Sequence, residues 1–221
     1  MIPMESTVFS SGLFLLAGFS GCGNDPNVQD RQIPDYSGPS FMEEGHQIAV
    51  LAGGCFWGVD AVYRHVKGVL GVISGYTGGS GNTADYKSVC TGRTGHAEAV
   101  RIVYDADIIS FRTLLKIFFS IVHDPTEVDR QGPDTGTQYR SAIFSTTNAQ
   151  KQMAEAYIDQ IDRAGIFPKP IASRVTDLDQ FYPAEDYHQN FLALNLSHPY
   201  IAIHDLPKLN LLRKRFPDLY Q

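Results

Sequence analysis

The segment of residues 48–54, IAVLAGG, is a short apolar run that ends on two glycines. Such a run is typical of a buried strand. Directly after it, Val59, Val62 and Val66 recur at the three- and four-residue spacing of one helix face. The chain is therefore expected to turn sharply from a strand into an amphipathic helix, with Cys55 in the turn at the helix N-terminus.

Strand-like and helix-like patterns continue to alternate after this turn. Strands are predicted at 69–79, 96–105, 138–146 and 171–178, and helices at 111–122 and 148–164. The order is β-α-β-β-α-β, followed by one more helix and one more strand. It predicts an α+β fold, a two-layer sandwich with a ferredoxin-like split β-α-β core, and a long coil after the last strand.

The first 45 residues differ in composition from the rest of the chain. Residues 8–22, VFSSGLFLLAGFSGC, form an apolar run too short to span a bilayer comfortably, and it ends in small residues before Cys22. This resembles a lipoprotein-type signal over residues 1–22, which would anchor the protein in a bacterial envelope through a lipidated Cys22. No Lys or Arg precedes Arg31, so an ordinary helix or a misplaced start codon, with a cytoplasmic protein, is the alternative. Residues 23–45, rich in Gly, Pro, Asn and Asp, are predicted to be a flexible tether to a domain at 46–221.

Composition excludes several classes of protein. The 221 residues, 43% of them hydrophobic, suffice for one well-buried domain. A net charge of −6 offers no basic field for nucleic acid. The three cysteines Cys22, Cys55 and Cys90 are an odd number without paired CxxC spacing, so we expect neither a disulfide scaffold nor a zinc site. No metal and no cofactor are predicted, and the protein is expected to be a monomer.

Cys55 is the main candidate for chemistry. A helix N-terminus presents unpaired N–H groups and a partial positive charge, which favour a thiolate and lower the thiol pKa. The alternative is a buried structural cysteine. Phe56 and Trp57 follow the thiol, and Trp57 is the only tryptophan. Two adjacent aromatic residues cannot both face the core, so one of them is expected to line a pocket.

The motifs GGCFWG (53–58), GYTGG (75–79), YKSVCTGRTGHAEAVRIVYD (86–105), HDP (123–125), DTGTQYRSAIF (134–144) and AEDYHQNF (184–191) occur in this order. Together they resemble the peptide methionine sulfoxide reductase A family over residues 48–195. The resemblance implies a thiol-dependent oxidoreductase that returns methionine S-sulfoxide, free or in oxidised proteins, to methionine. It makes residues 46–221 the catalytic domain.

The resemblance also implies roles for individual residues. Cys55 matches the nucleophile, which becomes a sulfenic acid, and Glu98 matches the acid that protonates the sulfoxide oxygen. Phe56 and Trp57 match the aromatic residues that hold the S-methyl group. The phenols that hydrogen-bond the oxygen correspond to Tyr86 and Tyr139, and a supporting carboxylate corresponds to Asp134.

The chemistry independently requires an acid such as Glu98. A sulfoxide oxygen is a poor leaving group unless it gains a proton as the S–O bond breaks. A carboxylic acid is protonated near neutral pH only if burial raises its pKa. Glu98 lies in an otherwise apolar strand pattern, although an edge strand with a solvated Glu98 would give the same pattern.

Two further interpretations remain open, one for the activity at Cys55 and one for the role of His188. A cysteine hydrolase or acyltransferase would need a histidine held against Cys55, for which no local signature exists. His188 in DYHQNF is expected to hold a loop by hydrogen bonds.

Recycling of the enzyme is where this chain departs from many relatives, which carry a resolving cysteine near the C-terminus. No cysteine follows Cys90 here. Cys90 is predicted to be a buried structural thiol, with a resolving role as the alternative. The Cys55 sulfenic acid should then wait for an external thiol, from thioredoxin or from glutathione with glutaredoxin.

Overall fold

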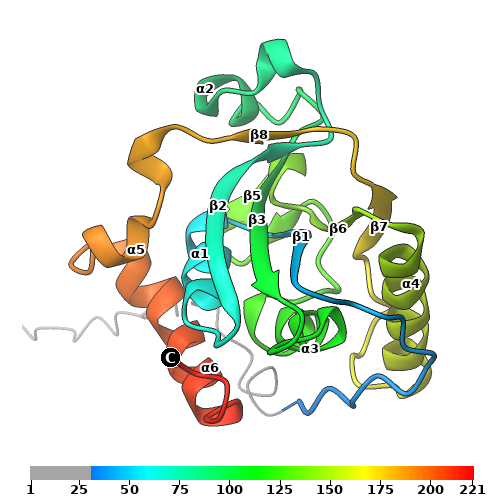
Figure 1. Cartoon of the computed structure of the whole chain (residues 1–221). Helices are drawn as coiled ribbons and strands as arrows, with labels where there is room; N and C mark the ends of the chain where they lie inside the picture. Colours follow the sequence, from blue (N-terminus) through cyan, green and yellow to red (C-terminus); the bar gives the residue numbers. More distant parts are fainter. Residues whose placement is uncertain (1–30) are drawn as a thin grey trace, which may run out of the picture.

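The computed structural model describes residues 31–221 (Figure 1). The predicted lipoprotein-type signal and residues 23–30 of the predicted tether lie outside the described residues. Within the described range no helix is long and apolar enough to cross a membrane.

The described chain alternates strands and helices in the expected order. The strands are β1 (His46–Gly53), β2 (Val69–Thr77), β3 (Ala97–Asp105), β4 (Arg130–Gln131), β5 (Asp134–Thr135), β6 (Ser141–Ser145), β7 (Arg174–Asp177) and β8 (Phe181–Pro183). The helices are α1 (Phe56–Arg64), α2 (Tyr86–Val89), α3 (Phe111–Ile117), α4 (Asn148–Arg163), α5 (Phe191–Leu194) and α6 (Leu206–Arg215).

Six strands form the main sheet in the order β7-β6-β1-β3-β2-β8. Its centre, β6-β1-β3-β2, is antiparallel throughout and is built from the two β-α-β halves that the sequence indicates. The α+β sandwich with a split β-α-β core is therefore confirmed. β7 adds to one edge parallel to β6, and β8 adds to the other edge antiparallel to β2.

Buried residues of α1, α3, α4 and α6 form the main core on one face of the sheet, whereas α2 lies beyond the end of β2 (Figure 1). Along β3, Val100, Ile102 and Tyr104 belong to that core, whereas Ala97 and Ala99 belong to a smaller cluster on the other face. Because side chains alternate along a strand, Glu98 points to the helix side. It lies opposite Tyr76 of β2.

Residues 31–45 contain no helix or strand, but they pack on the domain. Ile33 is only 5% exposed, and the Tyr157 hydroxyl of α4 donates a hydrogen bond to the Pro34 carbonyl over 2.6 Å. Glu43 accepts hydrogen bonds from the Tyr104 hydroxyl and from the Phe111 backbone. This part of the expected tether therefore lies against the domain and does not hang free of it.

The C-terminal segment, expected as a long coil, is largely helical. After α5 the chain enters a π-helical turn, η6 (Ile201–Asp205), which continues into α6. Leu209 and Leu212 of α6 are buried, and both η6 and α6 pack against α1. Pro207 lies in the first turn of α6, directly after the π-helical turn. This segment brings residues from beyond position 200 to the helix that follows Cys55.

Candidate active site

Cys55 occupies the sharp turn between β1 and α1, as the sequence predicts, and is the residue before the first helical turn. Gly54 has φ +93°, a left-handed conformation that favours glycine. A Cβ on Gly53 would lie 2.7 Å from Cγ1 of Val122. Both glycines therefore allow the close turn that places Cys55 at the N-terminus of α1.

The environment of Cys55 differs from the expectation of a lowered pKa. Burial raises the pKa of the Cys55 thiol well above its ordinary value, and the carboxyl groups of Glu98 and Asp205 add to the rise. A hydrogen bond from the Trp57 backbone N–H acts in the opposite direction. The prediction of a thiolate in the substrate-free protein is therefore wrong, because desolvation and nearby negative charge outweigh the helix N-terminus.

Glu98 is 1% exposed and accepts a hydrogen bond from the backbone N–H of Phe56, 3.1 Å away. Burial raises the pKa of Glu98 to about 8, against the lowering effect of that hydrogen bond, and Asp134 raises it further. The expected burial of this carboxyl group is confirmed, and the raised pKa agrees with its expected protonation near neutral pH. Its position next to the first turn of α1 places an acid beside Cys55.

The two predicted phenols and Asp134 come from separate segments. Tyr86 begins α2, Tyr139 ends the 3₁₀ turn η4 (Thr137–Tyr139), and Asp134 begins β5. Burial raises the pKa of both tyrosines, and charge on Glu98 and Cys55 raises them further. The fold thus brings both phenols into the electrostatic field of the thiol and the acid.

Phe56 and Trp57 diverge as expected of adjacent aromatic residues. Phe56 is buried and packs near Tyr76 and His188, while Trp57 is half-buried. The Trp57 indole N–H donates a hydrogen bond to Nδ1 of His188 over 3.1 Å, and its ring stacks on Phe191 with centroids 3.7 Å apart. Trp57 is held in a fixed orientation at the edge of the site.

A model of the family described as "Peptide methionine sulfoxide reductase" matches residues 47–219. The chain belongs to the peptide methionine sulfoxide reductase family.

Individual relatives cover nearly the whole domain. The chain is 51% identical over 207 residues to peptide methionine sulfoxide reductase MsrA 2 of Synechocystis, covering 94% of each chain. It is 53% identical over 176 residues to the MsrA 2 of Mesorhizobium japonicum, covering 80% of this chain and 90% of that protein.

Two solved structures of this family are similar in fold. Reduced Mxr1 from Saccharomyces cerevisiae has a TM-score of 0.63 at 33% identity, covering 72% of this chain and 91% of that chain. Methionine sulfoxide reductase A of Corynebacterium diphtheriae has a TM-score of 0.61 at 33% identity, covering 79% and 86%.

Three residues that sequence reasoning did not place in the site of this reductase contact its candidate residues. The Tyr200 hydroxyl, in the C-terminal segment, donates a short hydrogen bond to Asp134. Glu185 accepts hydrogen bonds from the Tyr76 hydroxyl and the Tyr86 backbone, both 2.9 Å long. His188 holds Trp57, so its expected role in holding a loop is refined to holding an aromatic residue. Only the motif around His188 gave any signal in the sequence.

Cys90 is exposed, so the prediction of a buried structural thiol is wrong. It follows the last residue of the short helix α2, whose buried side is formed by Val89. The Tyr86 hydroxyl donates a hydrogen bond to the Cys90 sulfur. Even so, partial burial and the charges of Glu98 and Glu185 raise the pKa of Cys90 above its ordinary value.

Proposed function

We propose that the reductase performs its reaction at Cys55, with Glu98 as the acid, on methionine S-sulfoxide in peptides, oxidised proteins and the free amino acid. The observation that carries the proposal is the buried Glu98 carboxyl group, with a pKa of about 8, hydrogen-bonded to the residue after Cys55. Such a group is a proton donor at neutral pH.

The first step transfers oxygen from the substrate to Cys55. The Cys55 sulfur attacks the sulfoxide sulfur while Glu98 donates its proton to the sulfoxide oxygen. The Glu98 carboxylate then accepts the proton that the thiol loses. The hydroxyl group of the resulting adduct passes from the substrate sulfur to the Cys55 sulfur, so the S–O bond to the substrate and the S–S bond formed in the attack both break, and methionine departs. Thiol and sulfoxide thereby become sulfenic acid and thioether, with Cys55 oxidised and the substrate reduced.

The raised pKa values of both groups fit this exchange. Cys55 and Glu98 each start neutral, so the substrate-free site does not hold two adjacent negative charges. When Glu98 protonates the sulfoxide oxygen it becomes a carboxylate, and this carboxylate is the base that removes the proton of the thiol. The thiolate is therefore formed only when substrate is present.

The remaining candidate residues would bind and orient the substrate. Tyr139 donates a hydrogen bond to the oxygen, and Tyr86 does so when its hydroxyl turns from the Cys90 sulfur to the substrate, which holds the oxygen on the Glu98 side. Phe56 and Trp57 surround the S-methyl group. Asp134, fixed by Tyr200, supports this arrangement.

The sulfenic acid is reduced by an external thiol, from thioredoxin or from glutathione with glutaredoxin. No cysteine follows Cys90 in the sequence, and the raised pKa of Cys90 disfavours the thiolate that attack requires. The protein is proposed to act as a monomer and to bind no nucleic acid. Anchoring through Cys22 stays a prediction, which the mass of the mature N-terminus from a membrane fraction would test.

The experiment is a single turnover without reductant, using a peptide that contains either purified sulfoxide epimer. We expect one methionine per Cys55 from the S epimer, and none from Cys55→Ser. Glu98→Gln should slow this step by roughly 10²–10⁴-fold, the usual range for a lost general acid. Substantial methionine formation by Cys55→Ser, or equal rates for the R epimer, would refute the proposal.

A further inference from the structure

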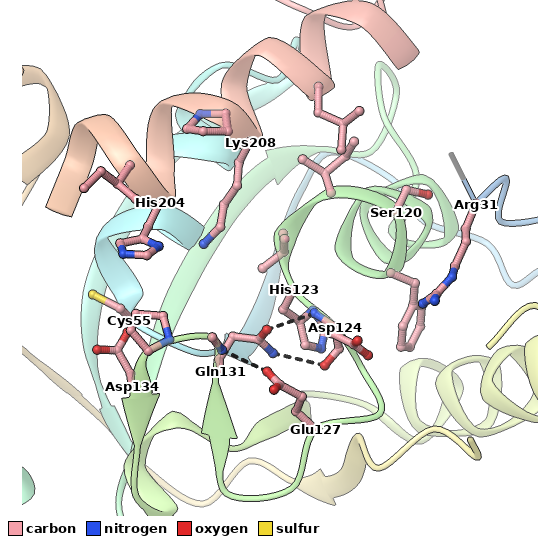
Figure 2. A pocket seen from close by; sticks show the side chains of 18 of the residues that line it. Arg31, Cys55, Ser120, His123, Asp124, Glu127, Gln131, Asp134, His204 and Lys208 are labelled. Atoms are coloured by element: carbon pink, nitrogen blue, oxygen red, sulfur yellow. Dashed lines mark hydrogen bonds between the residues drawn. The ribbon is translucent and has the colours of Figure 1, made fainter. Parts of the chain in front are cut away.

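A cavity of about 370 Å³ lies between the loop after α3 and the helical segment η6–α6. Figure 2 shows Cys55 at one end, close to His204 and Asp134, with Arg31 at the other end. The amine of Lys208 points into the space between them. Cys55 is therefore accessible from a cavity of small-molecule size.

This cavity borders the cluster assigned above to the substrate and shares part of it. Its lining includes Cys55, Asp134 and Tyr200, but none of Phe56, Trp57, Tyr86, Glu98 and Tyr139. Cys55 therefore lines the cavity, whereas Glu98 and the two phenols do not.

The polar groups on the loop side of the cavity are already hydrogen-bonded to one another. Gln131 bonds both the backbone N–H and the carbonyl of Asp124, and Glu127 accepts a hydrogen bond from the Gly132 N–H (Figure 2). The Asp124 carboxylate accepts hydrogen bonds from the N–H and hydroxyl of Thr126. The carboxylates of Asp124 and Glu127 therefore stabilise the loop through these hydrogen bonds.

The polar groups on the helix side of the cavity make fewer hydrogen bonds. Lys208 Nζ lies 3.4 Å from Asp205, at the limit of a hydrogen bond, and the amine has three protons to donate. Within residues 31–221 no hydrogen bond involves the His204 ring, which contacts the Tyr200 ring with centroids 4.8 Å apart. The groups left to bind a ligand are thus an ammonium group and an imidazole, which suit a carboxylate.

We propose that this cavity is the entry site of the reducing thiol, and that its ligand is a small carboxylate-bearing thiol of the glutathione class. The inference rests on the proposed function, in which the sulfenic oxygen stays on the side of Glu98. Displacement at sulfur requires the incoming sulfur to approach opposite the leaving oxygen, and we place this approach in the cavity, which Cys55 lines and Glu98 does not. A cavity of this volume admits a small peptide but no folded domain.

The reaction balances with two molecules of thiol. The first thiolate attacks the Cys55 sulfur, an S–S bond forms, the S–O bond breaks, and the hydroxyl of the sulfenic acid leaves as water after taking up one proton, which replaces the one that the thiol lost on ionising. The second thiolate attacks the outer sulfur of this mixed disulfide. Cys55 returns to the reduced state, and the two thiols leave as their disulfide.

The test uses the full protein, first oxidised with methionine sulfoxide and then mixed with glutathione or with glutathione diethyl ester. The two reagents share the thiol and differ in the charge of their carboxyl groups. We expect a mixed disulfide at Cys55 by intact mass, and faster reduction by glutathione. Lys208→Gln should lower the rate ratio of glutathione to ester by about fivefold, whereas Lys208→Arg should keep it. Lys214→Gln, on the exposed side of α6, is the matched control and should also keep the ratio.

Equal rates with glutathione and its ester in the unmodified protein would overturn the proposal. So would an equal loss of both rates in Lys208→Gln, or reduction by thioredoxin without any glutathione adduct. Failure of the proposed function would appear earlier and separately, as absence of methionine in the oxidation step before glutathione is added.

Discussion

The backbone N–H of Phe56 donates a hydrogen bond to Oε2 of Glu98, with a nitrogen-to-oxygen distance of 3.1 Å. This bond joins β3 to the first turn of α1, one residue after Cys55. It favours the carboxylate, while burial favours the neutral acid, and burial has the larger effect on the pKa of Glu98. Glu98 is thereby held in its protonated form next to the residue that follows Cys55.

The rate of the methionine-forming step should fall as the pH rises through about 8. Glu98, whose pKa is about 8, loses above that pH the proton that the sulfoxide oxygen needs. Rapid-quench single turnovers across the pH range would measure this. Glu98→Gln should be slow and should lack this fall, whereas Glu155→Gln, on the exposed side of α4, should retain it. If the rate of Glu98→Gln fell in the same way with rising pH, the titrating group would be a residue other than Glu98.

The raised pKa of Glu98 should also make the stability of the protein depend on pH. Between its ordinary value of 4.5 and about 8, the folded protein holds a proton that the unfolded chain has released. The free energy of unfolding therefore falls as the pH rises through this window. Glu98→Gln removes this term, so the stability difference between wild type and variant should shift by about 2–4 kcal/mol across the window. Urea unfolding at both ends of the window measures it, and parallel pH dependences would contradict the prediction.

Asp134→Asn should move the alkaline fall in rate to lower pH. The charge of Asp134 raises the pKa of Glu98, so its removal lets Glu98 ionise earlier. The measurement is the same pH profile, with the exposed Asp159→Asn as control. A shift to higher pH would show that Asp134 acts on Glu98 in another way.

His188→Ala should raise KM for a sulfoxide peptide by roughly 3–10-fold with a smaller effect on kcat. His188 accepts the hydrogen bond that orients Trp57, and a net contribution near 1 kcal/mol corresponds to such a change. Because Trp57 is the only tryptophan, its fluorescence reports the change of environment directly. His46→Ala, at the exposed start of β1, is the control. An unchanged emission spectrum with a raised KM would argue against orientation of Trp57 as the cause.

One equivalent of methionine sulfoxide should consume one thiol, at Cys55, and leave Cys90 reduced. The raised pKa of Cys90 keeps its thiol protonated at neutral pH and slows attack on the sulfenic acid. Thiol counting with an intact mass and a sulfenic acid probe tests this. A peptide map with Cys55 linked to Cys90 would make Cys90 the resolving cysteine, despite its protonation.

Local sequence was sufficient for the features that depend on contiguous residues. The periodicity after Cys55 predicts α1, and the alternation along β3 places Glu98 on one face of a strand. The order of strands and helices predicts the split β-α-β sheet because few topologies accommodate it. The family motifs lie in these same segments, so the family follows from the sequence, and the same motifs name Cys55 and Glu98 as the candidate nucleophile and acid.

Only the tertiary structure decided the electrostatics of the site and what surrounds it. Asp205 raises the pKa of Cys55 from 150 positions further along the chain, and Tyr200 meets Asp134 from a segment that reads as coil. The exposure of Cys90 depends on which side of α2 faces the core. Desolvation and charge act through space, so a pattern along the chain can place a thiol at a helix N-terminus without determining whether it is ionised there.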